Sequence, residues 1–445
     1  MRKKEKRNSK KKDRGIVDFM MLMKHFFKDL NQWIEEMEDP RNQSYITYTQ
    51  TDLSYLAILK NVCSQYSMRE MEESFNEDIC IDTLRIMSGD KKLEEMPHYD
   101  TLNYYLERLS PTCLAELRKK MVNSLLRGKQ FNRGRLLGKY WRVIMDGTGL
   151  FYFKEKHCEN CLCTTKKTED GNTVKMYYHK VLEAKIVLSD KIVISLETEF
   201  IENESENVSK QDCELNAAKR LVARLKKEYP RLPVCIQGDA LYATEPMMRL
   251  CRENSWQYIF TQKDTRQRIL DESYEWIKSG NGAEKSERIC AEKGSGFYVN
   301  HVEEVVGKSE EMNVYEYQYI NKDNEMLEFQ WISSLELSKK NLEEMILAGR
   351  GRWKIENEGF NNQKNGLYRI EHINSRNSNA MKNHYLFTQI ADILMQLYIV
   401  WNPLITEIGQ SIKNTSSRLL ESFRRQTVTD EDVSYIFRYT TVYLE

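Results

Sequence analysis

The sequence predicts an α/β protein with a mixed β-sheet flanked by helices and a helical N-terminal region. Residues 15–138 carry apolar side chains three and four positions apart, which is the spacing of helices buried on one face. Residues 140–201 form β-rich runs, and residues 212–263 alternate short apolar strands with helical segments. Antiparallel-looking strands followed by strand–helix alternation indicate a mixed sheet covered by helices.

Composition sets bounds on the class of protein. The chain has 445 residues, of which 40% are apolar and 30% charged, and its 67 Lys and Arg residues balance 67 Asp and Glu residues. These values are ordinary for a water-soluble protein with more than one domain, and no strong net charge indicates a partner. From the changes in periodicity we expect six segments, at residues 1–14, 15–138, 139–263, 264–335, 336–400 and 401–445.

The first two segments differ in character. Residues 1–14 are strongly basic, which predicts a disordered tail that either binds polyanions or is only solvated. Residues 16–37 predict one amphipathic helix ended before Pro40, and its charged residues exclude a membrane span. No secretory signal precedes this helix, so we expect the ten cysteines to be reduced thiols in a cytosol.

The elements of the sheet follow in chain order. The run "YWRVIMDGTGLFYF" predicts the first core strand, and the next apolar runs predict further strands with "SDK" as a turn. The elements expected next are a helix at 212–229 ended by Pro230, a short buried strand at 233–239, a helix opened by Thr244 with Pro246 in its first turn, and a strand at 256–263.

Beyond residue 264 the strand–helix alternation breaks. Several β-type segments separated by polar turns predict a β-rich insertion over 264–335. Residues 341–364 return to helical spacing, and a strongly apolar helix at 379–401 ends before Pro403. We therefore expect the insertion to separate the fifth core strand from the helix at 341–364.

Two aspartates each follow an apolar strand. Asp146 in "VIMDGTG" is expected at the end of the first core strand, and Asp239 in "VCIQGDALY" at the end of the fourth. If these strands are neighbours, both side chains emerge at the same edge of the sheet. Asp beside Gly is also a favoured turn residue, so either aspartate alone is compatible with simple turn chemistry.

A third carboxylate, Glu356, stands among cations in "GRGRWKIENEGFNNQK". On a helix it shares a face with Trp353 and Phe360, so it is expected to point inward, where a solitary carboxylate is unfavourable. Two aspartates and a glutamate brought together would instead hold divalent cations that activate one oxygen and stabilise another. The alternative is an ordinary solvated face of salt bridges.

These residues resemble the DDE transposases of bacterial insertion sequences, specifically the insertion-sequence-4-like group, which has an RNase H-like catalytic core. The motifs "DGTGLF", "KQDCELNAAKRL", "GDALYATEP" and "RWKIENEGFNNQKN" stand in the family's order, and the resemblance covers most of the chain. It implies that Asp146, Asp239 and Glu356 are the catalytic triad, holding two Mg²⁺ (or Mn²⁺) ions. The β-rich segment before Glu356 matches the insertion that is characteristic of this group.

The signature of the group is Tyr, two residues, Arg, three residues, Glu, six residues, Lys. Arg352 and Glu356 fit this pattern, whereas Gly349 stands at the Tyr position and Gln363 at the Lys position, with Lys364 one place later. The resemblance implies that Arg352 and Lys364 contact DNA at the strand end.

The resemblance further implies a phosphoryl-transfer enzyme that cleaves DNA at the ends of its element and joins the freed 3′-hydroxyls to target DNA. The partners would be double-stranded terminal repeats, read by the helical domain at 15–138, and target DNA, with a homodimer formed on the DNA in a bacterial cytoplasm at the nucleoid. Trp353 would either pack its helix or stack on a base. The alternatives are a metal-dependent nuclease without strand transfer and a catalytically silent DNA-binding protein.

A group of cysteines suggests a second metal. The run "HCENCLC" supplies His157, Cys158, Cys161 and Cys163, and Cys213 opens a later helix. A C-x-x-C pair with a third sulfur is a signal for structural zinc, although the usual second pair of ligands is absent. His179 is another possible ligand, and unmetallated thiols in a reducing cytosol are the alternative.

Overall fold

The computed structural model describes most of the chain. The described residues are 14–156, 158–167, 171–204, 210–263, 268–280, 282–289, 294–302, 312–352, 360, 362–402 and 411–438. The basic tail at 1–13 therefore lies outside the described residues, as do four residues named above: His157, Trp353, Glu356 and Pro403.

The N-terminal region is helical, as predicted. Its helices are α1 (Ile16–Phe26), α2 (Leu30–Glu35), α3 (Gln50–Val62), α4 (Met68–Phe75), α5 (Asp78–Ser88), α6 (Tyr99–Arg108) and α7 (Pro111–Arg127), with short 3₁₀ turns at Gln43–Tyr45 and Lys129–Gly134. Several begin at side-chain caps; Thr49, for example, accepts a hydrogen bond from the Asp52 backbone and forms a capping box before α3.

One helical prediction is wrong. The single amphipathic helix expected at 16–37 is two helices, because α1 ends at Phe26 and α2 begins at Leu30. Helix α1 is also not amphipathic in its setting: even Asp18 is buried, because α12, α14 and α15 pack around it. Burial on nearly all sides replaces the solvated face that periodicity alone predicted.

The core of the protein is a mixed sheet. Its strands are β1 (Trp141–Phe153), β3 (Thr173–Ser189), β4 (Ile192–Ile201), β5 (Val234–Gly238) and β6 (Gln257–Thr261), in the spatial order β4-β3-β1-β5-β6. The pairs β1/β3 and β3/β4 are antiparallel, whereas β1/β5 and β5/β6 are parallel. Helices α8 (Glu214–Glu228) and α9 (Glu245–Glu253) precede β5 and β6. The predicted mixed sheet flanked by helices is confirmed.

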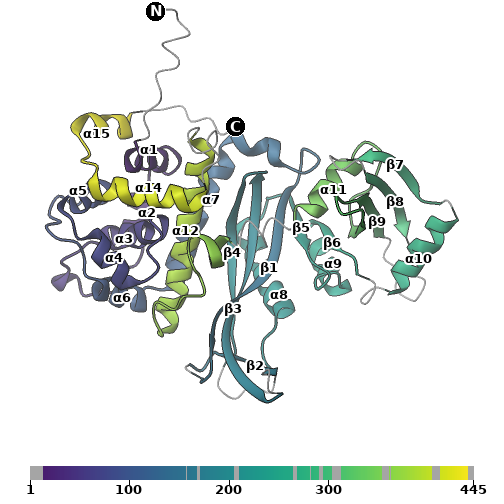
Figure 1. Ribbon diagram of the computed structural model, residues 1–445, viewed down its shortest axis with the longest axis horizontal. Helices are drawn as coiled ribbons and strands as arrows, with labels where there is room; N and C mark the ends of the chain where they lie inside the picture. The colour runs from purple at the N-terminus through teal and green to yellow at the C-terminus, as the bar shows by residue number, and fades with distance from the viewer. Residues whose placement is uncertain are drawn as a thin grey trace, which may run out of the picture.

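The β-rich insertion continues this sheet. Strand β10 (Met326–Ser333) pairs with β6 and is followed in space by β9 (Met312–Ile320), β8 (Gly294–Val302) and β7 (Glu284–Ile289). One helix, α10 (Arg268–Ser279), packs against β8 and was not predicted. The ten strands therefore form one sheet, which Figure 1 shows extending away from the helical body.

A long hairpin projects from the other side of the core (Figure 1). Strand β2 (Leu162–Lys167) pairs with the first part of β3, with Leu162 opposite Tyr178. The distal part of β1 pairs with the same strand, and the rings of Tyr152 and Tyr178 stack there. Strand β2 was not predicted, since its polar residues carry little β-type periodicity.

Helix α12 (Ser378–Trp401) joins the helical body to the sheet. It contacts α3, α6 and α7 on one side and β4 on the other (Figure 1). The remaining elements are α11 (Leu342–Arg350), a short π-helical turn (Asn362–Gly366), α14 (Ile412–Arg425) and α15 (Asp430–Phe437). Among the described helices, none is both long and apolar enough to cross a membrane.

Candidate metal-binding active site

Asp146 lies where the pairing of β1 changes. The last parallel pair between β1 and β5 joins Ile144 and Gln237, whereas pairing with β3 continues past Asp146, which lies opposite Glu183. The prediction that Asp146 ends the strand is therefore wrong, since β1 extends to Phe153. Strand β5, which neighbours β1 on one side, ends beside this position instead. The Asp146 carboxylate therefore lies where β1 continues past the end of β5.

Asp239 follows β5 directly, as predicted. Its Oδ1 accepts a hydrogen bond from the backbone N–H of Leu241 at 2.8 Å, so the carboxylate also shapes the turn after the strand. Because β1 and β5 are adjacent and parallel, Asp146 and Asp239 come to the same edge of the sheet. The charge of Asp239 contributes to raising the pKa of Asp146.

The environment of Asp146 disfavours its charged form. Burial raises the pKa of Asp146 to about 6, and the negative charges of Glu214 and Asp239 add to the rise. The positive charge of Arg352 and the hydrogen bond from the Gly147 N–H, at 2.9 Å, oppose it. The carboxyl of Asp146 is therefore harder to ionise than that of a solvent-exposed aspartate.

Glu214, in the first turn of α8, is a further carboxylate of this site and was not predicted. Its Oε1 accepts a hydrogen bond from the Tyr242 hydroxyl at 2.6 Å, and its Oε2 pairs with Lys180 Nζ at 2.5 Å. A Cβ at Gly147 would collide with the Glu214 carboxylate, so the glycine of "DGTG" makes room for it. An acidic residue in the first turn of a helix is common, because it interacts favourably with the helix dipole. The only sequence signal for a role of Glu214 in the site was its position in the motif "KQDCELNAAKRL".

Helix α11 carries the chain to the same edge. Gln237 of β5 donates a hydrogen bond from Nε2 to the carbonyl of Ala348 at 2.8 Å. A Cβ at Gly349 would lie within 2.8 Å of the Trp331 indole on β10, so a tyrosine there would displace that ring. Close packing of helix on strand thus explains the glycine at the Tyr position of the signature. Arg352 follows, and its charge reaches Asp146.

The described residues after Glu356 return to the sheet. Phe360 packs with Ile144, Val187 and Val193 in one buried cluster. Gln363 is buried and donates a hydrogen bond to Asp392 Oδ2 at 3.1 Å, so the residue at the Lys position of the signature belongs to the core.

Lys364, by contrast, is partly exposed. Its Nζ pairs with Glu371 Oε1 at 2.9 Å. A pair of this kind contributes little to stability, so it leaves Lys364 available for an anion.

A second cluster forms at the base of the hairpin. The Sγ atoms of Cys158 and Cys161 are 3.2 Å apart, and His179 Nε2 lies 3.4 Å from Cys158 and 3.6 Å from Cys161. The pairing of β2 with β3 brings the cysteines and the histidine together, because Leu162 lies opposite Tyr178 and Cys161 therefore lies beside His179. The other ring nitrogen, Nδ1, lies 3.9 Å from Glu202, which pairs with Lys382 of α12 at 2.6 Å.

The two other predicted sulfur ligands lie outside this cluster. The backbone of Cys163 exchanges hydrogen bonds with the Gln211 side chain, and Cys213 is an exposed residue that precedes α8. His157 is not among the described residues. The group that could hold a metal therefore contains Cys158, Cys161 and His179.

Comparisons with known proteins add little. No protein-family model matches the sequence, and no curated protein is detectably similar to it. A solved structure of the piggyBac transposase in a synaptic complex with hairpin DNA is similar over 94% of this chain and 80% of that chain, with 11% sequence identity and a TM-score of 0.40. Similarity this weak establishes no shared activity, so function has to be argued from the site.

The raised pKa of Asp146 predicts a pH dependence of stability. Without divalent cations, the folded protein holds the proton of the Asp146 carboxyl more tightly than the unfolded chain does. The free energy of unfolding should therefore fall as the pH rises from about 4 to about 6. Asp146→Asn should remove this loss, gaining about 1–3 kcal/mol over wild type at about pH 7 and nothing near pH 4. Urea denaturation at both pH values measures it, and a pH-independent difference would contradict it.

Proposed function

We propose that this protein is a DDE transposase, a metal-dependent enzyme that cleaves DNA and joins strands, with Asp146, Asp239 and Glu356 as its catalytic carboxylates. The observation that carries the proposal is the meeting of Asp146 and Asp239 at one edge of a mixed sheet, with a carboxyl pKa raised by burial and like charge. Perturbed carboxyls of this kind gather at functional sites.

The residues on both sides of Glu356 support its place in the triad. Arg352, four residues before it, is close enough to lower the pKa of Asp146. Phe360, four residues after it, packs against Ile144, which lies two residues before Asp146 and so on the same face of β1. A helical chain between those two points would carry Glu356 past Asp146, since residues four apart lie on one side of a helix.

The donor set suits magnesium. Mg²⁺ prefers carboxylate oxygens, and a divalent cation would stabilise the charged form of Asp146, which burial and the negative charges of Glu214 and Asp239 disfavour. When bound there, two such ions supply an activated oxygen nucleophile and stabilise the leaving oxygen. Asp146 and Asp239 would hold them from the sheet, and Glu356 would complete the set from its helix. Glu214 would support the site from outside by fixing Tyr242 and Lys180.

The cations of the same segment would position the DNA. Arg352 would contact the phosphate at or beside the scissile bond, because a guanidinium forms paired hydrogen bonds with phosphate oxygens. Lys364 would reach a neighbouring phosphate by exchanging its exposed partner Glu371 for DNA. Trp353 is proposed to lie against the strand end. The helical N-terminal region would read the terminal repeats, and the working form would be a homodimer on double-stranded DNA.

The proposal is tested by incubating the purified protein with Mg²⁺ and DNA that carries the inverted repeats flanking its reading frame. Cleavage at the repeat ends followed by joining to a target plasmid is the expected result. Cleavage without joining would favour the metal-dependent nuclease. Binding without cleavage at any Mg²⁺ or Mn²⁺ concentration would leave the silent DNA-binding protein as the better description.

We also propose that Cys158, Cys161 and His179 hold one zinc ion. The separations of His179 Nε2 from the two sulfurs, 3.4 and 3.6 Å, are those of atoms that share a zinc at about 2.0–2.3 Å in tetrahedral geometry. The two sulfurs, 3.2 Å apart, would move to about 3.8 Å on binding the ion. Glu202 beside His179 Nδ1 would orient the imidazole, an arrangement typical of zinc-bound histidines. The ion would fasten the loop before β2 to β3, at the base of the hairpin.

Protein purified without chelators is expected to contain one zinc per chain. Cys161→Ser and His179→Asn should each lose the metal, because a three-residue site does not tolerate the loss of a ligand. Cys163→Ser and Cys213→Ser are matched controls from the same region, and both should retain it. Elemental analysis of the five proteins decides the matter: absence of zinc from the wild type, or its retention in Cys161→Ser, would exclude this site.

A further inference from the structure

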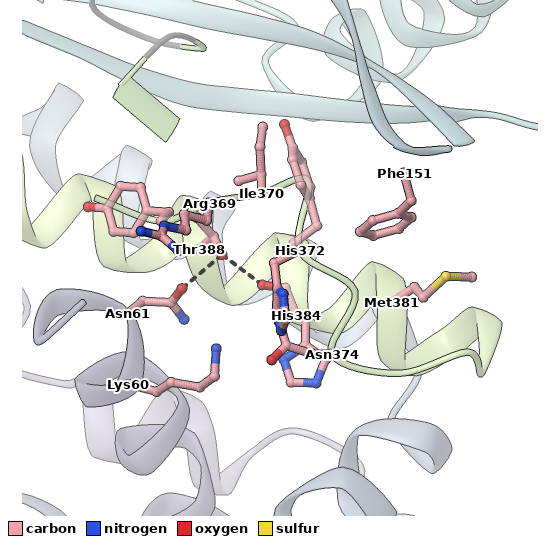
Figure 2. Close-up of a pocket in the computed structure, with 12 residues that line it drawn as sticks. Lys60, Asn61, Phe151, Arg369, Ile370, His372, Asn374, Met381, His384 and Thr388 are labelled. Carbon is pink, nitrogen blue, oxygen red and sulfur yellow. Dashed lines mark hydrogen bonds between the residues drawn. The ribbon is translucent and has the colours of Figure 1, made fainter. Parts of the chain in front are cut away.

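A small pocket lies between the helical body and the distal end of β1, away from the carboxylate site. Its walls come from α3, from the segment that follows the π-helical turn, from α12 and from β1 at Phe151 (Figure 2). Four of the lining residues, Lys60, Arg369, His372 and His384, carry cationic or imidazole nitrogens, and none of the lining residues is an acid.

The polar groups deepest in this pocket are incompletely paired. Lys60 is only 4% exposed, and its Nζ donates one long hydrogen bond, 3.3 Å, to the carbonyl of Tyr66. His384 Nε2 is buried, and among the described residues it has no hydrogen-bond partner. Thr388, in contrast, bonds to Asn61 and to the His384 carbonyl, as Figure 2 shows. Besides Lys60 and His384, three further lining residues have a buried side-chain oxygen without a hydrogen-bond partner among the described residues: Tyr368, Asn374 and Tyr385.

The mouth of the pocket is also basic and is held in an unusual conformation. Arg369 has a left-handed backbone, with φ 44°, which non-glycine residues seldom adopt. The guanidinium carbon of Arg369 lies 3.8 Å from the centroid of the Tyr66 ring. His372 is exposed beside it.

The residues that line the pocket supply no negative charge to balance its cations. Burial and the positive charges of Lys60 and His372 lower the pKa of His384 to about 3. Burial also lowers the pKa of Lys60 to about 8, and Glu70, which does not line the pocket, only partly opposes this. The pKa of His372 is lowered by burial and by Lys60 and Arg369, again against Glu70. Buried positive charge of this kind is unfavourable unless an anion accompanies it.

We infer that this pocket binds a single phosphate group, with Lys60 Nζ and His384 Nε2 as its inner donors and Arg369 and His372 at its mouth. The space open to the centres of water-sized atoms is ≈ 20 Å³, which admits the four oxygens of one phosphate and excludes a nucleobase. The phosphate is either inorganic phosphate or one group of a DNA backbone. This site is independent of the carboxylates and of the activity proposed for them.

The test compares the full-length protein in inorganic phosphate and in chloride at equal ionic strength. Phosphate should raise the melting temperature saturably, because a ligand that binds only the folded state stabilises it. It should also raise the pKa of His384, followed by NMR of the ring nitrogens. Lys60→Met and His384→Phe should each weaken phosphate binding at least tenfold, whereas Lys92→Met, at an exposed position, should not change it.

Lys60→Met removes a buried charge, so it is expected to fold; His384→Phe provides a second variant if it does not. A melting temperature that phosphate raises no more than chloride would overturn the inference, as would full phosphate binding in both folded variants. Two positive outcomes identify the source of the phosphate. Weaker DNA binding by Lys60→Met than by Lys92→Met assigns it to the DNA backbone, whereas unchanged DNA binding with lost phosphate binding assigns it to free phosphate.

Discussion

Asp146→Asn, Asp239→Asn and Glu356→Gln are each expected to lower Mg²⁺-dependent cleavage of end-containing DNA by orders of magnitude. Each change keeps the size of the side chain but removes the charge that a hard cation requires. DNA binding should survive, since the proposed phosphate contacts would come from other residues. Double variants should be little worse than single ones, because residues that act as one unit are strongly non-additive.

Two control variants test whether the loss of cleavage is specific to the three proposed carboxylates. Glu358→Gln changes a glutamate two positions from Glu356 and off the face that the helix is expected to turn inward, so activity should stay near wild type. Asp323→Asn alters an exposed residue of the turn between β9 and β10, and it should also leave activity unchanged. If Glu356→Gln folds normally and cleaves as well as Glu358→Gln, Glu356 belongs to a solvated face and the triad is wrong.

Arg118→Met is expected to be the most destabilising single change at the junction of the helices and the sheet. Arg118 of α7 is 1% exposed, and its guanidinium donates to Ser195 at 2.9 Å and to Glu197 at 3.1 Å on β4. Its charge also lowers the pKa of Glu183, which burial raises. Removing one partner from a buried ionic network costs about 3–5 kcal/mol, because the remaining charges lose their compensation.

The measurement is urea denaturation of Arg118→Met beside Arg127→Met, an exposed arginine of the same helix that should change stability by no more than about 0.5 kcal/mol. Adding Glu183→Gln to Arg118→Met should cost much less than the sum of the two single changes, since both charges are then absent. Equal losses for Arg118→Met and Arg127→Met would mean that the network does not hold α7 to the sheet.

The elements of the core could be predicted because their patterns are local. Strand β5 is a short apolar run bounded by Pro233 and Asp239, and α9 has Thr244 before it and Pro246 in its first turn. Each signal lies within a few residues of the element that it defines. The same holds for Asp239, whose position directly after its strand follows from the strand itself.

What could not be predicted depends on contacts between distant segments. Glu214 joins the site because α8 packs beside β3 and brings it to Lys180 and Tyr242. From the sequence, His179 was only one of several possible zinc ligands. The register of β2 against β3 is what brings it beside Cys161. The sequence contains both residues, but their proximity depends on tertiary pairing that single-chain periodicity does not encode.

Helix α12 also governs when the N-terminal half can finish folding during synthesis. The ribosome releases α3, α6 and α7 long before Ser378 emerges, yet these helices complete their packing only against α12. Asn383 even supplies the donors for the carbonyls of Leu106 and Leu109 at the end of α6. The nascent chain therefore exposes apolar surface for most of its translation, which favours chaperone capture. A polypeptide terminated before α12 would lack a complete helical body, so a truncated copy of the protein would not reach the folded state.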